Sequence, residues 1–299
     1  MVQPKPLRSM LWVPGNREEW MQNAPQYGAD ALVLDLEDSV PLPEKVYARQ
    51  LVRKILDTQG TAGYTTLVRV NDLESGLIED DVEALVCSGL YGIVLPKVRS
   101  SEDIVQADIL LKTLERRAGL EVGTILIKAS IETARAIREA YEIVKASPRV
   151  CHTGIGHIKS GDTARALGYV WTREGKETFF VRSKVLLDAR AAGDPYPCAG
   201  AWSDIRDLEG LRAYCLEMRQ LGYTGIALLH PSHIPIANEI FTPSSDEIAY
   251  WRGVVQTMEE AEKAGRAAIS YQGQMIDIAM VKMARDMLEM AQKLGVLKK

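Results

Sequence analysis

The sequence has little of what marks a secreted, membrane-spanning or metal-finger protein. It contains only four cysteines in 299 residues, and none of them shows the CxxC spacing of a zinc or redox motif. We interpret Cys87, Cys151, Cys198 and Cys215 as buried or semi-buried thiols in a reducing compartment. The chain has no run of about 18 apolar residues and no charged-then-apolar opening segment, so we expect a soluble, cytoplasmic protein.

The sequence also lacks a strong excess of charge of either sign. Its 36 basic and 40 acidic residues leave a net charge of -4, which argues against nucleic acid or an anionic membrane as the main partner. A local basic cluster for a phosphate remains open. With 46% hydrophobic residues, the chain can bury the core of one large domain.

Apolar runs typical of buried strands alternate with amphipathic runs typical of helices through the first 230 residues. The predicted strands are 9–13, 31–36, 65–70, 92–96, 124–129, 150–155, 198–202 and 225–229. The predicted helices are 43–57, 79–88, 101–118, 132–146, 176–192 and 207–221. Eight strands with helical crossovers indicate an α/β protein of the (β/α)8 TIM-barrel type, with a doubly wound open sheet as the alternative.

After Leu229 the pattern changes to two long helices, 245–264 and 275–294, joined by a Gly- and Ala-rich link at 265–273. We therefore predict a barrel over residues 1–244 and a C-terminal helical extension over 245–299. The barrel does not need this extension to close. The extension is either a packing arm or a lid over a barrel mouth, its own or that of a neighbouring subunit.

Polar residues gather where the predicted strands end, which is where barrels place their ligands. They are Arg8, Asp35, Glu37, Asp38, Arg69, Asn71, Lys97, Glu132, Asp162, Asp204 and His230. Glu132 and Asp162 follow adjacent strands about 5 Å apart, so one oxygen of each can reach the same cation. Two carboxylates without a nearby His or Cys suit Mg²⁺, with Mn²⁺ as the alternative. The alternative role of Glu132 is that of an acid at a helix N-terminus, stabilised by the helix dipole.

Arg69 ends a predicted strand, and its guanidinium fork suits a substrate carboxylate. Its alternative role is a partner for a rim acid such as Glu37. The carboxylates of Asp35, Glu37 and Asp38 cannot all be left unpaired, so at least one is expected to orient Arg69 or a metal-bound water. We assign Glu37 to this catalytic support.

One segment imitates a phosphate-binding loop. Gly156 and Gly161 have the Gly-x4-Gly spacing, but Asp162 stands where such a loop needs its lysine. An acid there would repel a triphosphate, so we reject a nucleotide-hydrolysing function.

The same rim residues carry a resemblance to a known family. The matching segments are RSMLWVPG (8–15), LDLEDSV (34–40), VRVN (68–71), LPKV (95–98), IETA (131–134), GD (161–162), HPSHI (230–234) and GQMID (273–277). In this order they resemble the citrate lyase β-subunit-like group of the HpcH/HpaI aldolase superfamily, which also holds malyl-CoA and citramalyl-CoA lyases. The chain departs from the family's pattern at Lys128, in a strand that is usually apolar.

The resemblance implies a (β/α)8 barrel that assembles into trimers or larger homo-oligomers. It implies that Glu132 and Asp162 bind Mg²⁺ and that Arg69 holds the carboxylate of a 2-oxo acid. Asp277 would be the acid/base that acts on the acyl-CoA carbon, delivered into a neighbouring subunit's mouth. Arg8 and Gly161 would contribute to substrate binding.

The expected activity is reversible cleavage of a 3-hydroxyacyl-CoA thioester into a 2-oxo acid and acetyl-CoA or a related acyl-CoA. Thioester hydrolysis in the same site is a further reaction open to it. Two alternatives remain: a lyase subunit that acts on an acyl-carrier-protein-bound substrate, and a catalytically silent ligand-binding homologue. The sequence does not distinguish citryl-, malyl- and citramalyl-CoA.

Overall fold

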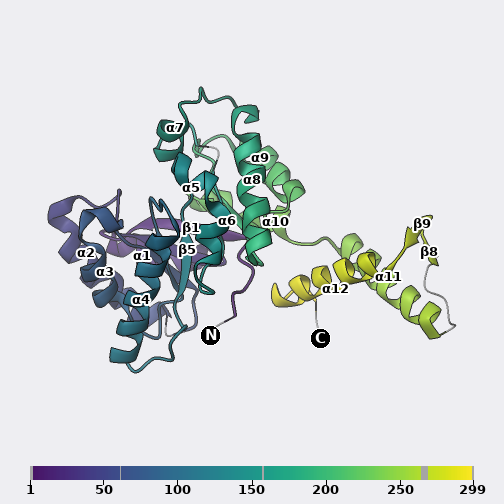
Figure 1. Cartoon of the computed structure of the whole chain (residues 1–299), viewed down its shortest axis with the longest axis horizontal. Coiled ribbons are helices and arrows are strands. Elements are labelled where there is room, and N and C mark those ends of the chain that lie inside the picture. The colour runs from purple at the N-terminus through teal and green to yellow at the C-terminus, as the bar shows by residue number, and fades with distance from the viewer. Residues whose placement is uncertain (1–2, 61, 157, 264–268, 298–299) are drawn as a thin grey trace. The chain divides into compact units, whose positions relative to one another are not determined.

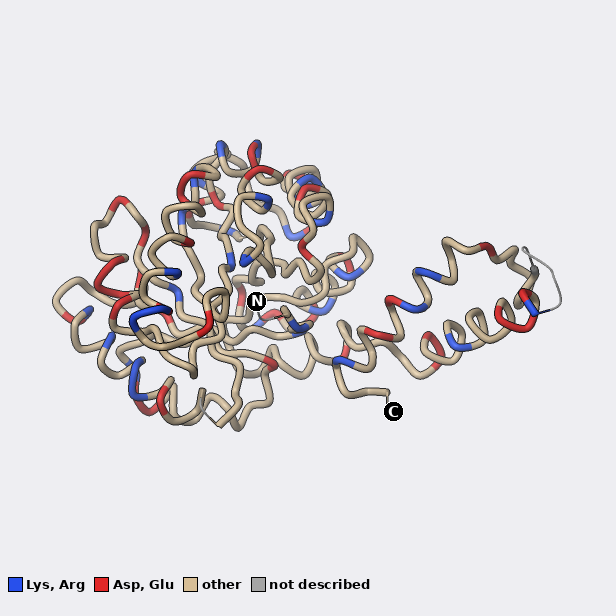
Figure 2. Tube along the Cα trace, turned by 60° about the horizontal axis from the view of Figure 1, so that its bottom comes forward, with Lys and Arg blue, Asp and Glu red and all other residues tan. Residues whose placement is uncertain are grey.

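The structure is a computed structural model, and it describes residues 3–60, 62–156, 158–263 and 269–297. The chain divides into two compact units, Met1–Asn238 and Glu239–Lys299. Figure 1 shows the strands of the larger unit surrounded by helices, and Figure 2 shows acidic and basic residues interspersed along both units.

The larger unit is built on seven parallel strands, in the order β5-β4-β3-β2-β1-β7-β6. Their bounds are β1 Ser9–Pro14, β2 Ala31–Asp35, β3 Thr66–Arg69, β4 Gly92–Leu95, β5 Leu126–Ala129, β6 Cys198–Ala199 and β7 Gly225–Leu228. All seven lie within the predicted strand segments or within one residue of them. Each strand is an almost continuous buried apolar run, as expected where both faces of a parallel sheet are covered.

Residues 150–155 close the ring between β5 and β6. Isolated parallel bridges join Ile127 to Val150 and Ser130 to Gly154. On the other side, the backbone N–H of Cys198 donates to the carbonyl of Thr153 at 3.1 Å. The seven strands and this eighth segment therefore form the staves of a barrel, and the predicted α/β barrel class is confirmed.

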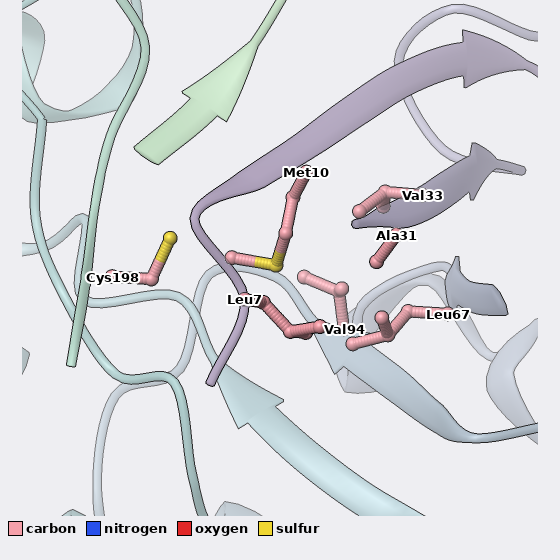
Figure 3. Close-up of a cluster of buried hydrophobic side chains, with 7 residues drawn as sticks. All are labelled: Leu7, Met10, Ala31, Val33, Leu67, Val94 and Cys198. Carbon is pink, nitrogen blue, oxygen red and sulfur yellow. The ribbon is translucent and has the colours of Figure 1, made fainter. Parts of the chain in front are cut away.

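The barrel interior holds a cluster of apolar side chains. In Figure 3, Met10, Leu7 and Val94 lie together, with Ala31, Val33 and Leu67 on the neighbouring strands. Cys198 completes the cluster. Met10 pairs in register with Ala31, and register partners in a parallel sheet point to the same face. This row of contacts fixes which face of every strand looks inward.

Helices follow the strands as the crossovers of a barrel. Their bounds are α1 Glu18–Asn23, η1 Ala24–Tyr27, η2 Leu42–Glu44, α2 Lys45–Ile55, η3 Leu56–Gly60, η4 Leu73–Ser75, α3 Ile78–Leu85, α4 Ser101–Arg117, α5 Ala134–Arg138, α6 Ala140–Lys145, α7 Asp162–Leu167, α8 Lys176–Ala192, α9 Leu208–Leu221, η5 Pro231–His233 and α10 Ile234–Phe241. The single helix predicted over 132–146 is instead two, because the chain leaves the helical conformation at Glu139. The first of them begins at Ala134, capped by the Thr133 side chain.

The smaller unit is a pair of helices with a β-hairpin between them. The long helices α11 (Ser245–Lys263) and α12 (Ile278–Lys293) pack through Val254, Met258, Val281 and Ala284. The antiparallel strand β8 (Ile269–Tyr271) lies in the segment predicted as a link, and its partner β9 (Gln274–Ile276) overlaps the start of the helix predicted over 275–294, which begins instead at Ile278. Residues 265–268 of that predicted link lie outside the described residues.

Two expectations from composition concern the whole chain. All four cysteines are buried free thiols. Within the described ranges, no helix is both long and apolar enough to cross a membrane.

Candidate functional site

The carboxyl ends of β2 and β3 are joined by a charged network around Arg69. The Nε and Nη2 atoms of Arg69 donate to the two carboxylate oxygens of Asp35, at 2.6 and 2.7 Å. Its Nη1 lies 2.7 Å from an oxygen of Glu37, and its guanidinium sits 4.8 Å above the ring of Trp12. Most of the fork predicted to hold a substrate carboxylate is thus engaged by rim acids, which is the alternative role considered for Arg69.

The loop after β2 folds back so that its acids meet this arginine. The Asp35 carboxylate accepts hydrogen bonds from the backbone N–H groups of Glu37 and Ser39. Burial alone would raise the pKa of Asp35, but the hydrogen bonds and charge of Arg69 outweigh it and hold that pKa below its ordinary value. Asp35 is therefore a fixed anion that sets the position of Arg69.

Glu37 lies between two cations. Beside Arg69, the Nζ of Lys97 is 2.6 Å from its other carboxylate oxygen. Burial raises the pKa of Glu37 to about 7, against the opposing charges of Arg69 and Lys97. Lys97 follows β4 in a left-handed backbone conformation (φ 50°), which is uncommon outside glycine. The protein accepts this strained backbone to bring Lys97 to the acids, and sequence patterns give no sign of it.

Glu132 and Asp162 approach each other at the ends of two neighbouring staves. Glu132 is half-buried between β5 and α5, and Asp162 is the first residue of α7. Burial raises the pKa of the Glu132 carboxyl; the charges of Arg69 and Lys128 oppose this rise, and the charge of Asp162 adds to it. The charge of Asp162 thus acts on Glu132, and a divalent cation can offset two neighbouring carboxylates.

The donor set of this acid pair fits a hard divalent cation. Within the described part of the chain, Glu132 forms no ion pair, whereas Asp162 contacts only the exposed Arg165 at 3.0 Å. No group of three or more His, Cys, Asp and Glu side chains in the described residues is arranged to hold a metal by itself. Mg²⁺ commonly takes only one or two protein carboxylates and completes its shell with water and substrate oxygens.

A cavity of about 770 Å³ opens beside the Arg69 network. It combines aromatic surface with polar groups, as ligand pockets do. Trp20 is 60% exposed and Tyr27 46% exposed at its wall. The other lining residues are Leu11, Trp12, Val13, Pro14, Glu19, Asn23, Ala24, Asp35, Asp38, Ser39, Arg69, Leu229, His230 and Pro231. Sequence patterns do not identify Trp20 and Tyr27 as site residues, because exposed aromatics in a short helix follow no recognisable pattern.

The expected position of Arg8 at the carboxyl-end rim is wrong. β1 begins at Ser9, so Arg8 stands at the amino end of the strand. There its guanidinium pairs with Asp30, just before β2, at 2.7 Å. Arg8 thus lies at the opposite end of the barrel from Glu132, and its role in substrate binding stays a prediction without structural support.

Gly161 immediately precedes α7, with φ of 133°, a conformation that side-chain-bearing residues rarely adopt. It thereby sets the start of the helix that presents Asp162. Two other rim residues serve local structure: the Asp81 carboxylate accepts from the backbone and side chain of Asn71, and Asp204 accepts from the backbone of Arg206.

Asp277 belongs to the smaller unit, where it is exposed and precedes α12. Its carboxylate accepts a hydrogen bond from the backbone N–H of Met280 at 3.0 Å, as an N-cap residue does. The cap fixes the side chain at the start of the helix and leaves the second oxygen open to other contacts. Its acid/base role stays a prediction.

Comparison with known proteins gives similarities that extend through both units. Residues 8–231 match the HpcH/HpaI aldolase/citrate lyase family. The chain is 34% identical over 289 residues to citrate lyase subunit beta of Escherichia coli strain K12, covering 97% of this chain and 94% of that protein. It is 33% identical over 294 residues to (3S)-malyl-CoA thioesterase of Cereibacter sphaeroides strain ATCC 17025, covering 98% and 97%. The fold resembles that of the protein CitE from Mycobacterium tuberculosis in complex with magnesium, acetoacetate and coenzyme A, with a TM-score of 0.70, 26% identity and coverage of 96% and 98%.

Proposed function

Because the chain belongs to the HpcH/HpaI aldolase/citrate lyase family, we propose that it is a magnesium-dependent lyase acting on a 3-hydroxyacyl-CoA thioester. The family assignment confirms the predicted enzyme class, a carbon–carbon lyase. The proposed reaction yields a 2-oxo acid and acetyl-CoA or a related acyl-CoA, or joins them in reverse. The observation that carries the proposal is that Glu132 and Asp162 follow neighbouring staves, at the barrel end that also holds Arg69 and the cavity.

In this proposal Glu132 and Asp162 hold the cation at the mouth of the barrel. A bound Mg²⁺ supplies Lewis-acid polarisation of the substrate's hydroxyl and carboxylate oxygens. Arg69 keeps the oxo-acid carboxylate in register, and its own position is fixed by Asp35 and Glu37. Glu37 is a positioning residue, because it contacts Arg69 and Lys97.

The proposed cleavage breaks the bond between the hydroxyl-bearing carbon and the carbon next to the thioester. The hydroxyl gives its proton to solvent as its carbon becomes the carbonyl of the oxo acid, and the electron pair of the broken bond passes to the carbon next to the thioester, giving an enolate. Asp277 then gives a proton to the enolate, or removes one in the synthetic direction. The family resemblance supports this role for Asp277, which is exposed at the start of α12.

The direct test is the identity of the products. Purified protein is incubated with Mg²⁺ and citryl-, malyl- and citramalyl-CoA, and the products are identified by mass spectrometry. A 2-oxo acid with acetyl-CoA supports the lyase proposal. No turnover of any of the three, in protein that binds Mg²⁺, contradicts it.

Thioester hydrolysis is a second candidate, favoured by the 33% identity with a (3S)-malyl-CoA thioesterase. In the same assay this reaction gives free CoA and the intact hydroxy acid. An acyl-carrier-protein substrate is the remaining alternative, consistent with relatives that are subunits of citrate lyase. It predicts turnover only when the acyl group is offered on the carrier protein.

We further propose that Asp277 acts within a homotrimer or larger homo-oligomer, in the mouth of a neighbouring subunit. Asp277→Asn is expected to lower kcat by about 10²–10⁴-fold. Mixing it with an inactive metal-site variant, such as Glu132→Gln, then regenerates some complete sites. Activity regained after confirmed subunit exchange supports the shared site, and no regain places Asp277 in its own subunit's site.

A further inference from the structure

A lysine lies inside the barrel with no partner of opposite charge in contact with it. Lys128, in the middle of β5, is 6% exposed. Its ammonium forms no ion pair and no hydrogen bond with any residue within the ranges that the structure describes. Lysine is rarely this buried in a protein interior without an acidic partner, so this residue requires an explanation.

The register of the sheet shows where Lys128 points. Arg69 of β3 pairs with Val94 of β4, and Val94 pairs with Lys128 of β5. Val94 belongs to the cluster inside the barrel (Figure 3), so Arg69 and Lys128 face the same interior. They stand in one row, two strands apart, which corresponds to about 10 Å between their Cα atoms. Lys128 thus points into the barrel interior, a few residues before Glu132, which follows the carboxyl end of the same strand.

The two cations of this row differ in how their charge is compensated. Arg69 is held by Asp35 and Glu37 at 2.6 to 2.7 Å. The charge of Lys128 reaches Glu132 and opposes the rise of that residue's pKa, but the two groups are not in contact. The charge of Lys128 also reaches His152, Cys151 and Cys198, none of which is an anion, since burial lowers the pKa of His152 to about 3 and raises those of both thiols. The buried carboxylate of Asp194 acts on the same thiols, but its oxygens accept hydrogen bonds from the backbone N–H groups of His152, Thr153 and Tyr196.

We propose that Lys128 is a substrate-binding residue whose ammonium pairs with a carboxylate of the bound 2-oxo acid. The anionic ligand supplies the counter-charge that the protein does not place there, and ion-paired hydrogen bonds of this kind are the strong ones. This inference rests on the proposed function for the class of ligand. It adds a second cation beside Arg69, on the wall of the barrel that leads to Glu132.

The test compares one anionic and one neutral ligand in two proteins. Pyruvate and its uncharged amide, pyruvamide, are titrated into full-length protein and into Lys128→Met by calorimetry, with Mg²⁺ held constant and again with chelator. The wild-type protein is expected to bind pyruvate at least about tenfold more tightly than pyruvamide, equivalent to about 1.4 kcal/mol. In Lys128→Met the ratio falls clearly below the wild-type value, with Arg69 accounting for the preference that remains, and the melting temperature does not fall because no ion pair within the protein is lost.

A purely structural lysine would give the opposite pattern, a lower melting temperature and an unchanged ligand ratio. Lys145→Met, at an exposed lysine of α6, is the matched control and keeps the wild-type ratio. Lys128→Gln, similar in length and neutral, carries the test if the methionine variant does not fold. An unchanged ratio in a folded Lys128 variant overturns the proposal.

The binding test of Lys128 and the cleavage test of the proposed function can fail independently. A Lys128-dependent preference for pyruvate without cleavage of any acyl-CoA supports this inference and contradicts the lyase. Cleavage with a ratio that does not depend on Lys128 does the reverse.

Discussion

The two ends of the barrel both bury charge, but they treat it differently. At the amino end, Arg149 is 2% exposed and fully matched: its Nε lies 2.7 Å from Asp108, and its two Nη atoms lie 2.7 and 2.6 Å from Glu115. Glu115 also accepts from the backbone of Gly123 and Ile125. Every charge in this cluster has a partner, so the cluster is structural.

At the carboxyl end the pairing is incomplete. Arg69 is matched by Asp35 and Glu37, but neither Glu132 nor Lys128 has a counter-ion in contact with it among the described residues. Perturbed or unmatched charges of this kind cluster at functional sites. Complete pairing therefore identifies the end of the barrel that maintains the fold, and incomplete pairing identifies the end that binds ligands.

The largest expected effect comes from removing one of the unpaired acids at the carboxyl end of the barrel. Glu132→Gln is expected to lower Mg²⁺-dependent turnover by about 10³–10⁴-fold, since the metal's Lewis-acid contribution amounts to several kcal/mol. It leaves the melting temperature unchanged or higher, because the repulsion with Asp162 is relieved. Turnover of the preferred acyl-CoA and thermal unfolding are measured together, with the exposed Glu142→Gln as the control. Full activity in Glu132→Gln would remove the metal hypothesis.

The same experiment at the amino end is expected to give the opposite result. Arg149→Met leaves the fully buried Glu115 and the buried Asp108 without their cation, which costs about 3–5 kcal/mol in the free energy of unfolding. Urea unfolding measures this loss, and kcat per folded molecule stays at the wild-type level. Adding Glu115→Gln to Arg149→Met recovers part of the stability. A loss below about 1 kcal/mol for Arg149→Met would show that the cluster is not structural.

The pH dependence of stability tests whether the paired Glu115 at the amino end stabilises the fold. Burial would raise the pKa of Glu115, but the hydrogen bonds and charge of Arg149 outweigh it and lower that pKa below the unfolded value of about 4.5. The resulting stabilisation is fully present above the unfolded pKa and is lost as the pH falls through the lowered folded value, at about 1.4 kcal/mol per unit of difference. Urea midpoints between pH 3 and pH 7, roughly the range over which carboxyl groups titrate, are expected to fall more gently on the acid side in Glu115→Gln. An equally steep fall would assign the acid sensitivity to other carboxyls.

An exposed ion pair shows how little the free energy of unfolding is expected to change when the paired charges are not buried. Arg135 and Glu139 of the α5 segment are 3.1 Å apart, with side chains 64% and 34% exposed. Arg135→Ala is expected to change the free energy of unfolding by about 0.5 kcal/mol or less. A loss comparable to that of Arg149→Met would mean that burial does not distinguish the two pairs.

The sequence predicted the fold well because each stave is a short apolar run between turn residues. The segment 150–155 was predicted as a strand and forms only isolated bridges. His152 adopts a left-handed conformation (φ 57°), which interrupts the extended backbone. The hairpin of the smaller unit was missed because its turn, Gln272-Gly273 with both φ positive, lacks the Asn-Gly or Asp-Gly signal of such turns.

The site was less predictable than the fold. The position of Glu132 and Asp162 at strand ends is readable from the chain, because it depends only on where buried runs stop. The partners of Arg69 are not, since they depend on how the loop after β2 turns Asp35 and Glu37 towards it. Arg8 was misplaced because it precedes the strand, both as predicted (9–13) and as observed, so its side chain belongs to the amino end of the barrel.

The irregular stave at 150–155 has a consequence for how ligands enter. It is joined to β5 through isolated bridges and to β6 through single hydrogen bonds, whereas β1 to β5 are joined by continuous ladders. Glu132 follows the neighbour on one side of this seam, and Asp162 lies on the chain that leaves it. The weakly hydrogen-bonded part of the sheet thus runs between the two acids. Local opening of the sheet there would admit a ligand without disturbing the other strands, and it would be measured as faster amide hydrogen exchange in residues 150–155.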